Sequence, residues 1–363
     1  MKPQKNIIIF RTDRLGDFII HSRPILELKK KFPNSNIILV CSEINKKIID
    51  NYDFIDKTII YDKSYNFLKK IKIFFHIINK IYFLSLVLDG KKFSYFCNIF
   101  IKSKHKLGIV YKYYLNFFNF KINCLKPSRF YNFFFFNKYE IFTSRRFLIK
   151  SENLCQKYID LLSQFNLGIT NKDGYIFPNN SKKILNQFNK LRIKFNIKKY
   201  IIIHFDEKWI DVKNIEKDLI HNLVQLQKKS KLKIILTGYN NNFEYFKILK
   251  KFFYYFDFKN FIFLIKSSYN KKIIILDNLD IFLFEKFLSK SIINISCHSG
   301  FLAQVCGANR SNVVDIINQK DEVWYSCWTP KNTFHKFIYK SNNKKINLII
   351  IFNNIFKLLK KKL

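Results

Sequence analysis

The chain has 363 residues, of which 48% are hydrophobic and 18% aromatic. This length and hydrophobic content are enough for two domains, each with a hydrophobic core, and they exclude disorder of the whole chain. With 65 Lys and Arg residues against 26 Asp and Glu residues, the net charge of +39 favours anionic partners, namely nucleic acid, an acidic membrane face or phosphorylated substrates. An A/T-rich genome also produces abundant Lys, Asn, Ile, Phe and Tyr beside scarce Gly and Pro, so both origins of the charge stay open.

The seven cysteines include no C-x-x-C pair, which argues against a disulfide framework or a zinc site. Arg11 and Asp13 interrupt the first apolar run, so no signal peptide is expected. No run approaches the roughly 20 apolar residues of a spanning helix. We therefore expect a cytoplasmic protein, either free or peripheral on the inner face of the cytoplasmic membrane.

Strands and helices alternate in the first 110 residues. Continuous β-branched and apolar runs predict buried parallel strands with basic helices between them, at Asn6–Phe10, Ile37–Cys41, Lys57–Tyr61 and Tyr82–Leu88. Such alternation implies right-handed crossovers and a doubly wound sheet.

Residues 111–147 interleave aromatic and basic side chains, a pattern that fits base stacking or, equally simply, a core with a solvated face. A linker is expected at 171–180, and residues 152–167 before it favour a helix. A second α/β unit follows, with strands expected at Tyr200–His204, Leu232–Thr237, Lys271–Leu276, Ile292–Ser296 and Val313–Ile317, and helices at 213–229, Phe243–Phe252, Leu279–Ser289 and from Gly300.

Ligands of open α/β sheets bind beyond the carboxyl ends of the strands, where three loops are of interest. In the first, Arg11–Asp17, the acidic Asp17 is either functional or an ordinary helix N-cap. In the second, Ser296–Phe301, small residues expose N–H groups that suit a phosphate. The third loop is His204–Trp209. In one interpretation Lys208 reaches a phosphate and Trp209 forms a wall of the ligand site; in the other the loop is a solvated charge run with a packing tryptophan.

Taken in order, these segments resemble glycosyltransferase family 9, the bacterial lipopolysaccharide heptosyltransferases. The opening strand and Arg11-Thr12-Asp13-Arg14-Leu15-Gly16-Asp17 resemble the family's first strand and its R-x-D/S-x-x-G-D loop. The segments Asp89–Lys92 and Lys104–Ile109 are similar to later family stretches, and His298-Ser299-Gly300 stands where the family has D-S/T-G.

This resemblance implies an α/β chain of the GT-B type, with two Rossmann-like doubly wound domains facing a central cleft. The implied organisation is an acceptor-binding domain over 1–170, a nucleotide-sugar-binding domain over 171–340 and a basic amphipathic helix over 341–363. That last helix is expected to pack back on the N-terminal domain; the alternative is a membrane contact, for which residues 63–80 are a second candidate.

The implied reaction is an inverting glycosyl transfer that moves a sugar, with heptose from ADP-heptose as the expected donor, onto a lipopolysaccharide core or related acceptor. Asp17 is the expected general base. The expected acceptor-binding residues are Arg11, Asp13, Arg14 and Gly16, and the expected donor-binding residues are Lys208, Glu244, His298, Ser299, Gly300 and Phe301. No D-x-D pair occurs, so neither a metal nor another cofactor is expected. The expected partners are the nucleotide-sugar, an anionic lipopolysaccharide-type acceptor and the cytoplasmic membrane surface, without nucleic acid.

Two departures keep alternatives open. His298 replaces the family's acidic residue, and Ala303 and Gln304 stand where the family often has a histidine. Because both positions touch the donor in the family, a different nucleotide-sugar is one alternative. The other is a non-catalytic basic protein that binds nucleic acid or a membrane.

Overall fold

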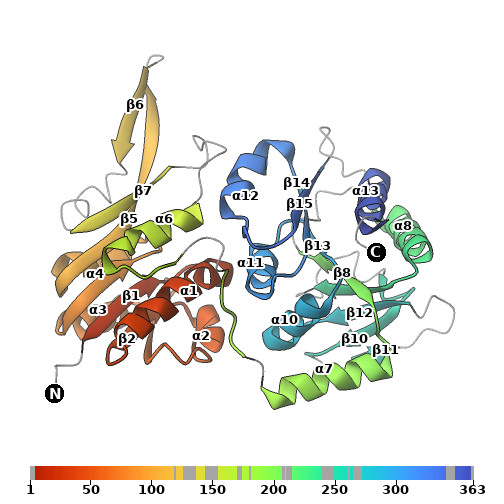
Figure 1. Cartoon of the computed structure of the whole chain (residues 1–363), viewed down its shortest axis with the longest axis horizontal. Coiled ribbons are helices and arrows are strands. Elements are labelled where there is room, and N and C mark those ends of the chain that lie inside the picture. Colours follow the sequence, from red (N-terminus) through yellow and green to blue (C-terminus); the bar gives the residue numbers. More distant parts are fainter. Residues whose placement is uncertain are drawn as a thin grey trace. The chain divides into compact units, whose positions relative to one another are not determined.

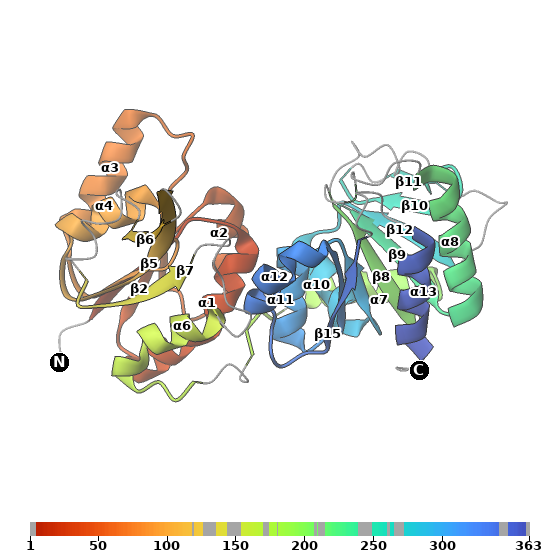
Figure 2. The same ribbon diagram turned by 90° about the horizontal axis from the view of Figure 1, so that it is seen from above.

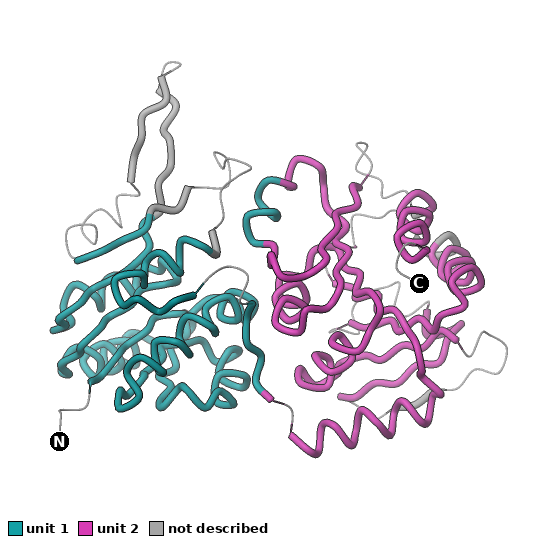
Figure 3. Tube along the Cα trace, in the orientation of Figure 1, with its two compact units in different colours: residues 1–178, 323–328 teal, residues 179–322, 329–363 magenta. Residues whose placement is uncertain are grey.

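The chain forms two compact units in the computed structural model. Residues 1–178 with 323–328 make unit 1, and residues 179–322 with 329–363 make unit 2 (Figure 3). The structure describes residues 5–117, 120–125, 136–143, 154–169, 174–179, 181–206, 209, 215–238, 249–259, 262–264, 272–340 and 348–360. The N-terminal segment of unit 1 ends at Pro178, a little beyond the predicted boundary at 170.

Unit 1 is built on one sheet whose strands run in the order β3-β2-β1-β4-β5-β6, with β7 also paired to β5 (Figure 1). The pairs among β1 to β5 are parallel, and β6 runs antiparallel to β5. The strands are β1 (Asn6–Arg11), β2 (Asn36–Cys41), β3 (Lys57–Ile60), β4 (Ile81–Val87), β5 (Lys102–Phe117), β6 (Phe120–Leu125) and β7 (Lys138–Thr143). Strand β1 lies in the middle because its run of Ile and Phe is buried on both faces.

Helices cover both faces of this sheet. Helices α3 and α4 lie on one face and α1 and α6 on the other (Figure 2). The helical segments of this part are α1 (Leu15–Lys31), α2 (Glu43–Ile49), α3 (Phe67–Ile78), α4 (Lys92–Phe100), α6 (Leu154–Leu161) and the short 3₁₀ turn η2 (Ser163–Phe165). The predicted alternation of strands and helices in the first 110 residues is confirmed.

Unit 2 repeats the pattern with the strand order β11-β10-β12-β9-β8-β13-β14-β15, parallel except between β10 and β11. Its strands are β8 (Tyr200–Phe205), β9 (Lys233–Gly238), β10 (Tyr254–Asp257), β11 (Ile262–Leu264), β12 (Ile273–Asp277), β13 (Asn294–Ser296), β14 (Val313–Ile317) and β15 (His335–Tyr339). Its helices are α7 (Lys182–Lys194), α8 (Ile215–Ser230), α10 (Ile281–Lys290), α11 (Gly300–Asn309) and α13 (Leu348–Lys360), with a 3₁₀ turn η4 (Gln319–Asp321).

The last helix does not pack where the sequence suggested. The apolar stripe of α13 is buried in the core of unit 2, beside α8, through Ile351, Phe352, Ile355 and Leu359. The expectation that the C-terminal helix returns to the N-terminal domain is therefore wrong. The segment that joins unit 1 is instead α12 (Glu322–Trp328), whose Trp328 ring lies 6.4 Å from that of Tyr158.

Parts of two sequence predictions fall outside the described residues. Of the aromatic stretch 111–147, residues 118–119, 126–135 and 144–147 are not described, and most of the expected helix Phe243–Phe252 is not described either. Among the residues that the structure does describe, no helix combines the length and apolarity needed to cross a bilayer.

Candidate functional site

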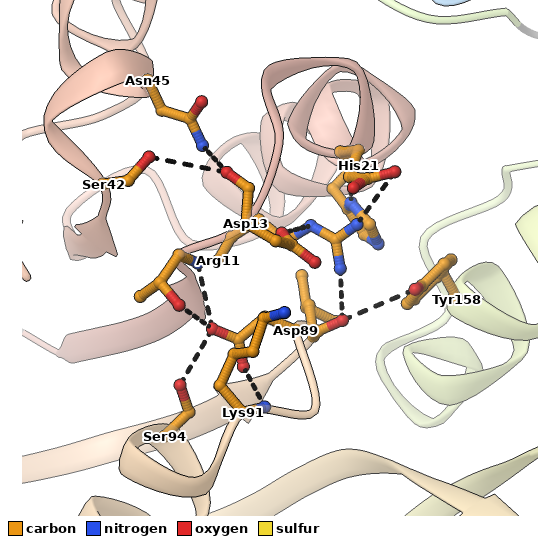
Figure 4. Close-up of polar contacts among 12 residues, drawn as sticks. Arg11, Asp13, His21, Ser42, Asn45, Asp89, Lys91, Ser94 and Tyr158 are labelled. Carbon is orange, nitrogen blue, oxygen red and sulfur yellow. Dashed lines mark hydrogen bonds and ion pairs between the residues drawn. The ribbon is translucent and has the colours of Figure 1, made fainter. Parts of the chain in front are cut away.

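The loop between β1 and α1 is organised around a buried arginine (Figure 4). Arg11 ends β1 and is only 2% exposed. Its Nε lies 3.0 Å from Oδ1 of Asp13, and its Nη2 lies 3.8 Å from Oδ1 of Asp17. Nη1 donates a hydrogen bond to the backbone oxygen of Leu88, just after β4. One guanidinium thus holds two carboxylates and ties together the loops that follow two neighbouring strands.

Asp89 fixes the same loop from the other side. Its Oδ2 accepts hydrogen bonds from Thr12 N at 3.0 Å and Thr12 Oγ1 at 2.7 Å, and from Ser94 Oγ at 2.9 Å. Its Oδ1 accepts from Lys91 N at 3.0 Å. Because β1 and β4 are parallel neighbours, their carboxyl ends meet, and these bonds follow from that pairing. The loop is therefore rigidly positioned.

Asp17 is the more accessible of the two carboxylates held by Arg11. Its side chain is 39% exposed, against 17% for Asp13. It is the third residue of α1, whose N-cap is Arg14, so the interpretation of Asp17 as the N-cap is wrong. An acidic residue in the first turn is nevertheless favoured by the helix dipole. Gly16 beside it is buried and Arg14 is exposed.

Asp13 holds its proton unusually well. Burial raises the pKa of this carboxyl, and the neighbouring Asp17 and Asp89 raise it further against the attraction of Arg11, so that it lies at about 7. The backbone oxygen of Asp13 accepts a 2.7 Å bond from Nδ2 of Asn45, in the first turn of α2, which ties the loop to the helix that follows β2. The site thus contains a carboxyl that changes charge near neutral pH.

His21 lies one turn after Asp17 and is fully enclosed. Its Nδ1 lies 2.7 Å from the backbone oxygen of Asp17, and the geometry makes the nitrogen the donor. Its ring packs edge-on against Tyr158 with 3.9 Å between centroids. Burial and then the charge of Arg11 hold the pKa of His21 well below its usual range. The neutral ring therefore braces the first turn of α1.

The second group of predicted residues lies at the start of α11 in unit 2. Ser299 caps the helix, its Oγ accepting from Leu302 N at 3.4 Å, while its own N–H donates to Ser296 Oγ at 3.1 Å. A helix leaves its first N–H groups without intrahelical partners, so among the described residues those of Gly300 and Phe301 remain for a ligand. A methyl group built on Gly300 would meet nothing within 4 Å, which shows open space there.

His298 precedes this helix and is held by a buried carboxylate. Oδ2 of Asp315, on β14, accepts from His298 Nδ1 at 2.9 Å and from His335 Nε2, on β15, at 2.8 Å, while Oδ1 accepts from Ser296 Oγ at 3.0 Å. Asp315 is fully buried. Burial alone raises the pKa of Asp315, but the two histidines outweigh it and hold the pKa well below its usual range.

The backbone of His298 is also unusual, with φ of +58°, in the left-handed region that non-glycine residues seldom adopt. A residue that adopts this conformation because its surroundings impose it is often part of a functional site. The side chain is 15% exposed, and Asp315 fixes its Nδ1. Among the described residues, no cluster of His, Cys, Asp and Glu suits a metal ion.

Two predicted donor residues cannot be placed, because Lys208 and Glu244 lie outside the described residues. Trp209, which follows Lys208 in the sequence, can be placed. It is fully buried, donates its indole N–H to His204 O at 3.0 Å and packs 4.7 Å from the Phe205 ring. Trp209 is thus a packing residue and forms no wall of a ligand site.

Sequence reasoning missed the supporting residues of both groups: His21, Asp89 and Tyr158 in unit 1, and Asp315 and His335 in unit 2. One signal was present, since Asp315 is a lone acidic residue inside the apolar run Val313–Ile317. A buried charge in a strand needs a partner, so this position could have been recognised. Nothing local points to His335, because only strand pairing brings it to Asp315.

Comparison with known proteins connects these two units to solved structures. A family 9 glycosyltransferase from Veillonella parvula is similar in structure, with a TM-score of 0.71 and 13% identity. The match covers 99% of this chain and 98% of that chain. The E. coli heptosyltransferase WaaC, solved with ADP, is matched over 99% of this chain and all of that chain, with a TM-score of 0.62 and 13% identity. The chain has the GT-B fold. The fold class predicted from the sequence is thereby confirmed.

Because the sequence identity is only 13%, this structural likeness shows the fold alone, and the reaction has to be argued from the site. A putative UDP-N-acetylglucosamine 2-epimerase from Listeria monocytogenes also matches, over 99% of this chain and 88% of that chain, with a TM-score of 0.54 and 12% identity. No protein-family model matches the sequence, and no curated protein matches it significantly. The GT-B fold thus accommodates more than one kind of chemistry, and the residues of the two loops must distinguish among them.

Proposed function

We propose that the chain is a glycosyltransferase that moves a sugar from a nucleotide-sugar to a hydroxyl group of an acceptor, with inversion at the anomeric carbon. The observation that carries this proposal is the accessible carboxylate of Asp17, held by the buried Arg11 at the carboxyl end of β1. The resemblance of the same loop to glycosyltransferase family 9, together with the full-length structural likeness to a member of that family, supports it.

In the proposed reaction Asp17 is the general base. Its carboxylate accepts the proton of the acceptor hydroxyl while that oxygen forms a bond to the anomeric carbon. The bond between this carbon and the diphosphate oxygen breaks in the same step, and its electron pair leaves with the nucleoside diphosphate. Arg11 contributes by fixing the carboxylate, since it is too buried to contact an acceptor directly. The exposed Arg14 is the better candidate for contact with an anionic acceptor, and Asp13 and Gly16 shape the loop.

On the donor side the leaving diphosphate gains negative charge. The N–H groups of Gly300 and Phe301 and the dipole of α11 stabilise it, and Ser299 fixes the helix start. His298, oriented through Nδ1 by Asp315, presents its Nε2 edge to the donor. Lys208 is proposed to neutralise the diphosphate and Glu244 to bind the ribose. We propose that these groups act without a metal ion or other cofactor.

The proposed donor is ADP-heptose and the proposed acceptor an anionic lipopolysaccharide core or related surface glycan. Support for the donor comes from structures similar to this chain, among them E. coli WaaC with ADP-2-deoxy-2-fluoro heptose, at a TM-score of 0.59. The histidine at position 298 favours the alternative of a different nucleotide-sugar.

The test is release of nucleoside diphosphate by purified protein with a membrane extract as acceptor source, screening ADP-heptose beside UDP-, GDP- and dTDP-sugars in the presence of EDTA. Wild type is compared with Asp17→Asn, Asp13→Asn and the exposed control Asp53→Asn. We expect release from one donor, unchanged in the control, lowered by at least about 100-fold in Asp17→Asn and lowered less in Asp13→Asn.

Each other outcome changes a stated part of the proposal. Full activity of Asp17→Asn removes the base, and a greater loss in Asp13→Asn transfers that role to Asp13. Release that requires a divalent cation contradicts metal independence. Release from a donor other than ADP-heptose replaces the donor alone. If every donor is inert, the chain is a non-catalytic binding protein.

A further inference from the structure

One stretch of unit 1 is almost free of acidic residues. Residues 63–139 contain 15 Lys or Arg residues and a single acidic residue, Asp89. Asp89 is 4% exposed and accepts four hydrogen bonds, two from Thr12 in the β1 loop, one from Lys91 N and one from Ser94 Oγ. The composition of the whole chain does not explain this, since 26 acidic residues among 363 would place about five in such a stretch. Helices α3 and α4, which lie in this stretch, carry four lysines and no acidic residue.

The same stretch exposes large apolar side chains. On α3, Phe67 is 75% exposed, Leu68 74% and Phe75 51%; on α4, Phe96 is 50% exposed and Phe100 51%. Ile77 is the one buried residue of α3. A helix whose apolar residues pack only against the core of unit 1 buries them as one stripe. Helix α3 therefore exposes more apolar surface than packing within unit 1 explains.

These side chains form one continuous surface across the two helices. Phe67, Ile71 and Phe75 follow at four-residue spacing on one side of α3. The half-buried Phe74 joins the helices, with ring centroids 5.5 Å from Phe75, 5.0 Å from Phe96 and 5.6 Å from Phe100. We call Phe67, Leu68, Phe75, Phe96 and Phe100 the α3–α4 apolar surface. Helices α3 and α4 lie together on one side of the sheet (Figure 2).

Exposed lysines accompany this surface. Lys69 and Lys72 lie on α3 between its apolar residues, and Lys92 is in the first turn of α4. Long amphipathic side chains of this kind extend their charge toward water or phosphate while their stems stay against apolar groups. Apolar side chains between lysines on a surface helix are the pattern of helices that lie in the interface of an anionic bilayer.

We propose that the α3–α4 apolar surface docks on an anionic lipid bilayer, with its aromatic side chains at the boundary of headgroups and acyl chains and its lysines on the lipid phosphates. The bilayer satisfies both features at once. A nucleic acid would pair with the lysines but leave most of this apolar area in water, and a second copy of the same surface would bring two basic faces together. The proposal assigns to named side chains the membrane contact for which residues 63–80 were a candidate in the sequence, and it does not depend on the proposed glycosyl transfer.

The experiment is flotation of the full-length protein with vesicles of phosphatidylcholine alone or with 30% phosphatidylglycerol. The test variant is Phe67→Ser with Leu68→Ser and Phe75→Ser. The matched control is Ile44→Ser with Ile193→Ser, two residues that are 79% and 81% exposed outside this surface. All five side chains are exposed, so the melting temperatures should agree within a few degrees.

We expect wild type and control to float with the anionic vesicles alone, and the test variant to bind at least tenfold less. Lys69→Gln with Lys72→Gln should weaken binding and flatten its dependence on NaCl. As a second readout, a Phe75→Trp protein should show a blue-shifted emission that brominated lipid quenches, and an Ile193→Trp protein should not.

Three results would overturn the proposal: equal flotation of the test variant and wild type, flotation that is equally strong with neutral vesicles, or no flotation at all. Loss of binding to a labelled single-stranded oligonucleotide in the test variant, with flotation unchanged, would assign the surface to nucleic acid instead. Dissociation of a wild-type dimer by the same substitutions, with flotation unchanged, would assign it to self-association. Because no sugar donor is involved, failure here leaves the proposed reaction untouched.

Discussion

The buried Arg11 and the carboxylate of Asp13 form an ion pair of 3.0 Å immediately before the helix that carries Asp17. Taking such a pair out of water is costly, so it persists only where each partner is well satisfied. Arg11 also holds Asp17 and the end of β4, which means that one side chain sets the geometry of the whole loop.

The first prediction concerns Asp13 and pH. Its pKa is raised in the folded state to about 7 from an ordinary value of 3.8, so between these values the folded state binds the proton more strongly than the unfolded state. Stability contributed by this group is therefore present below about pH 4 and lost as pH rises toward 7, by roughly 1.4 kcal/mol for each pH unit. Urea denaturation from pH 4 to 8 should show this fall in wild type and a flatter profile in Asp13→Asn. Parallel profiles would contradict the assignment.

The second prediction compares two arginine pairs. Arg11→Met leaves a buried carboxyl without its partner and should lower the free energy of unfolding by about 3–5 kcal/mol at pH 8, and by less at pH 5, where Asp13 is protonated. Arg23, paired with Glu27 at 3.3 Å, is 30% exposed. Arg23→Met should change the free energy of unfolding by at most about 0.5 kcal/mol. Similar losses in both variants would show that the burial of Arg11 has no special role.

Much of the fold was predictable because local patterns dominate it. The strands predicted at Asn6–Phe10 and Val313–Ile317 are read correctly from continuous apolar runs bounded by polar residues. The strands from 102 to 143 were not predicted, since aromatic and basic residues interleave there and the glycine of the stretch, Gly108, lies inside a strand rather than at an end. The position of α13 was not predictable either, because its apolar stripe fits any complementary helix.

The candidate site shows the same division. Residues at the end of a strand or shortly after it were found, since the strand itself implies their place in the fold: Arg11, Asp17 and His298. Residues that support them from other strands were missed, because pairing between distant segments decides which side chains meet. Asp89 is 77 positions from Thr12, and His335 is 20 positions from Asp315. Such contacts carry no local signal.

The third prediction concerns two glycines with opposite surroundings. A methyl group on Gly108, in β5, would collide with the buried ring of Phe136, whereas Gly300 faces open space. Gly108→Ala should therefore lower the free energy of unfolding by about 1–3 kcal/mol, and Phe136→Leu in the same protein should recover part of the loss. Gly300→Ala should leave the melting temperature unchanged and raise the KM for the nucleotide-sugar. An unchanged KM would mean that the donor phosphates do not approach Gly300.

The fourth prediction separates the role of His298 from that of its support. Asn tolerates the left-handed backbone of position 298, so His298→Asn should fold normally and raise the KM for the donor by about tenfold, with the acceptor KM unchanged. Asp315→Asn should raise the same KM and also destabilise the protein by about 3–5 kcal/mol, because it removes a fully buried carboxylate from two histidines.

The control for this pair is His76→Asn, an exposed histidine on α3 that should leave both KM values and the melting temperature unchanged. Steady-state kinetics with each substrate varied in turn, together with thermal denaturation, distinguishes the outcomes. A normal donor KM in His298→Asn would assign the imidazole to the structure of unit 2 alone. A donor KM that rises in Asp315→Asn but not in His298→Asn would show that Asp315 acts on the donor site through the fold rather than through His298.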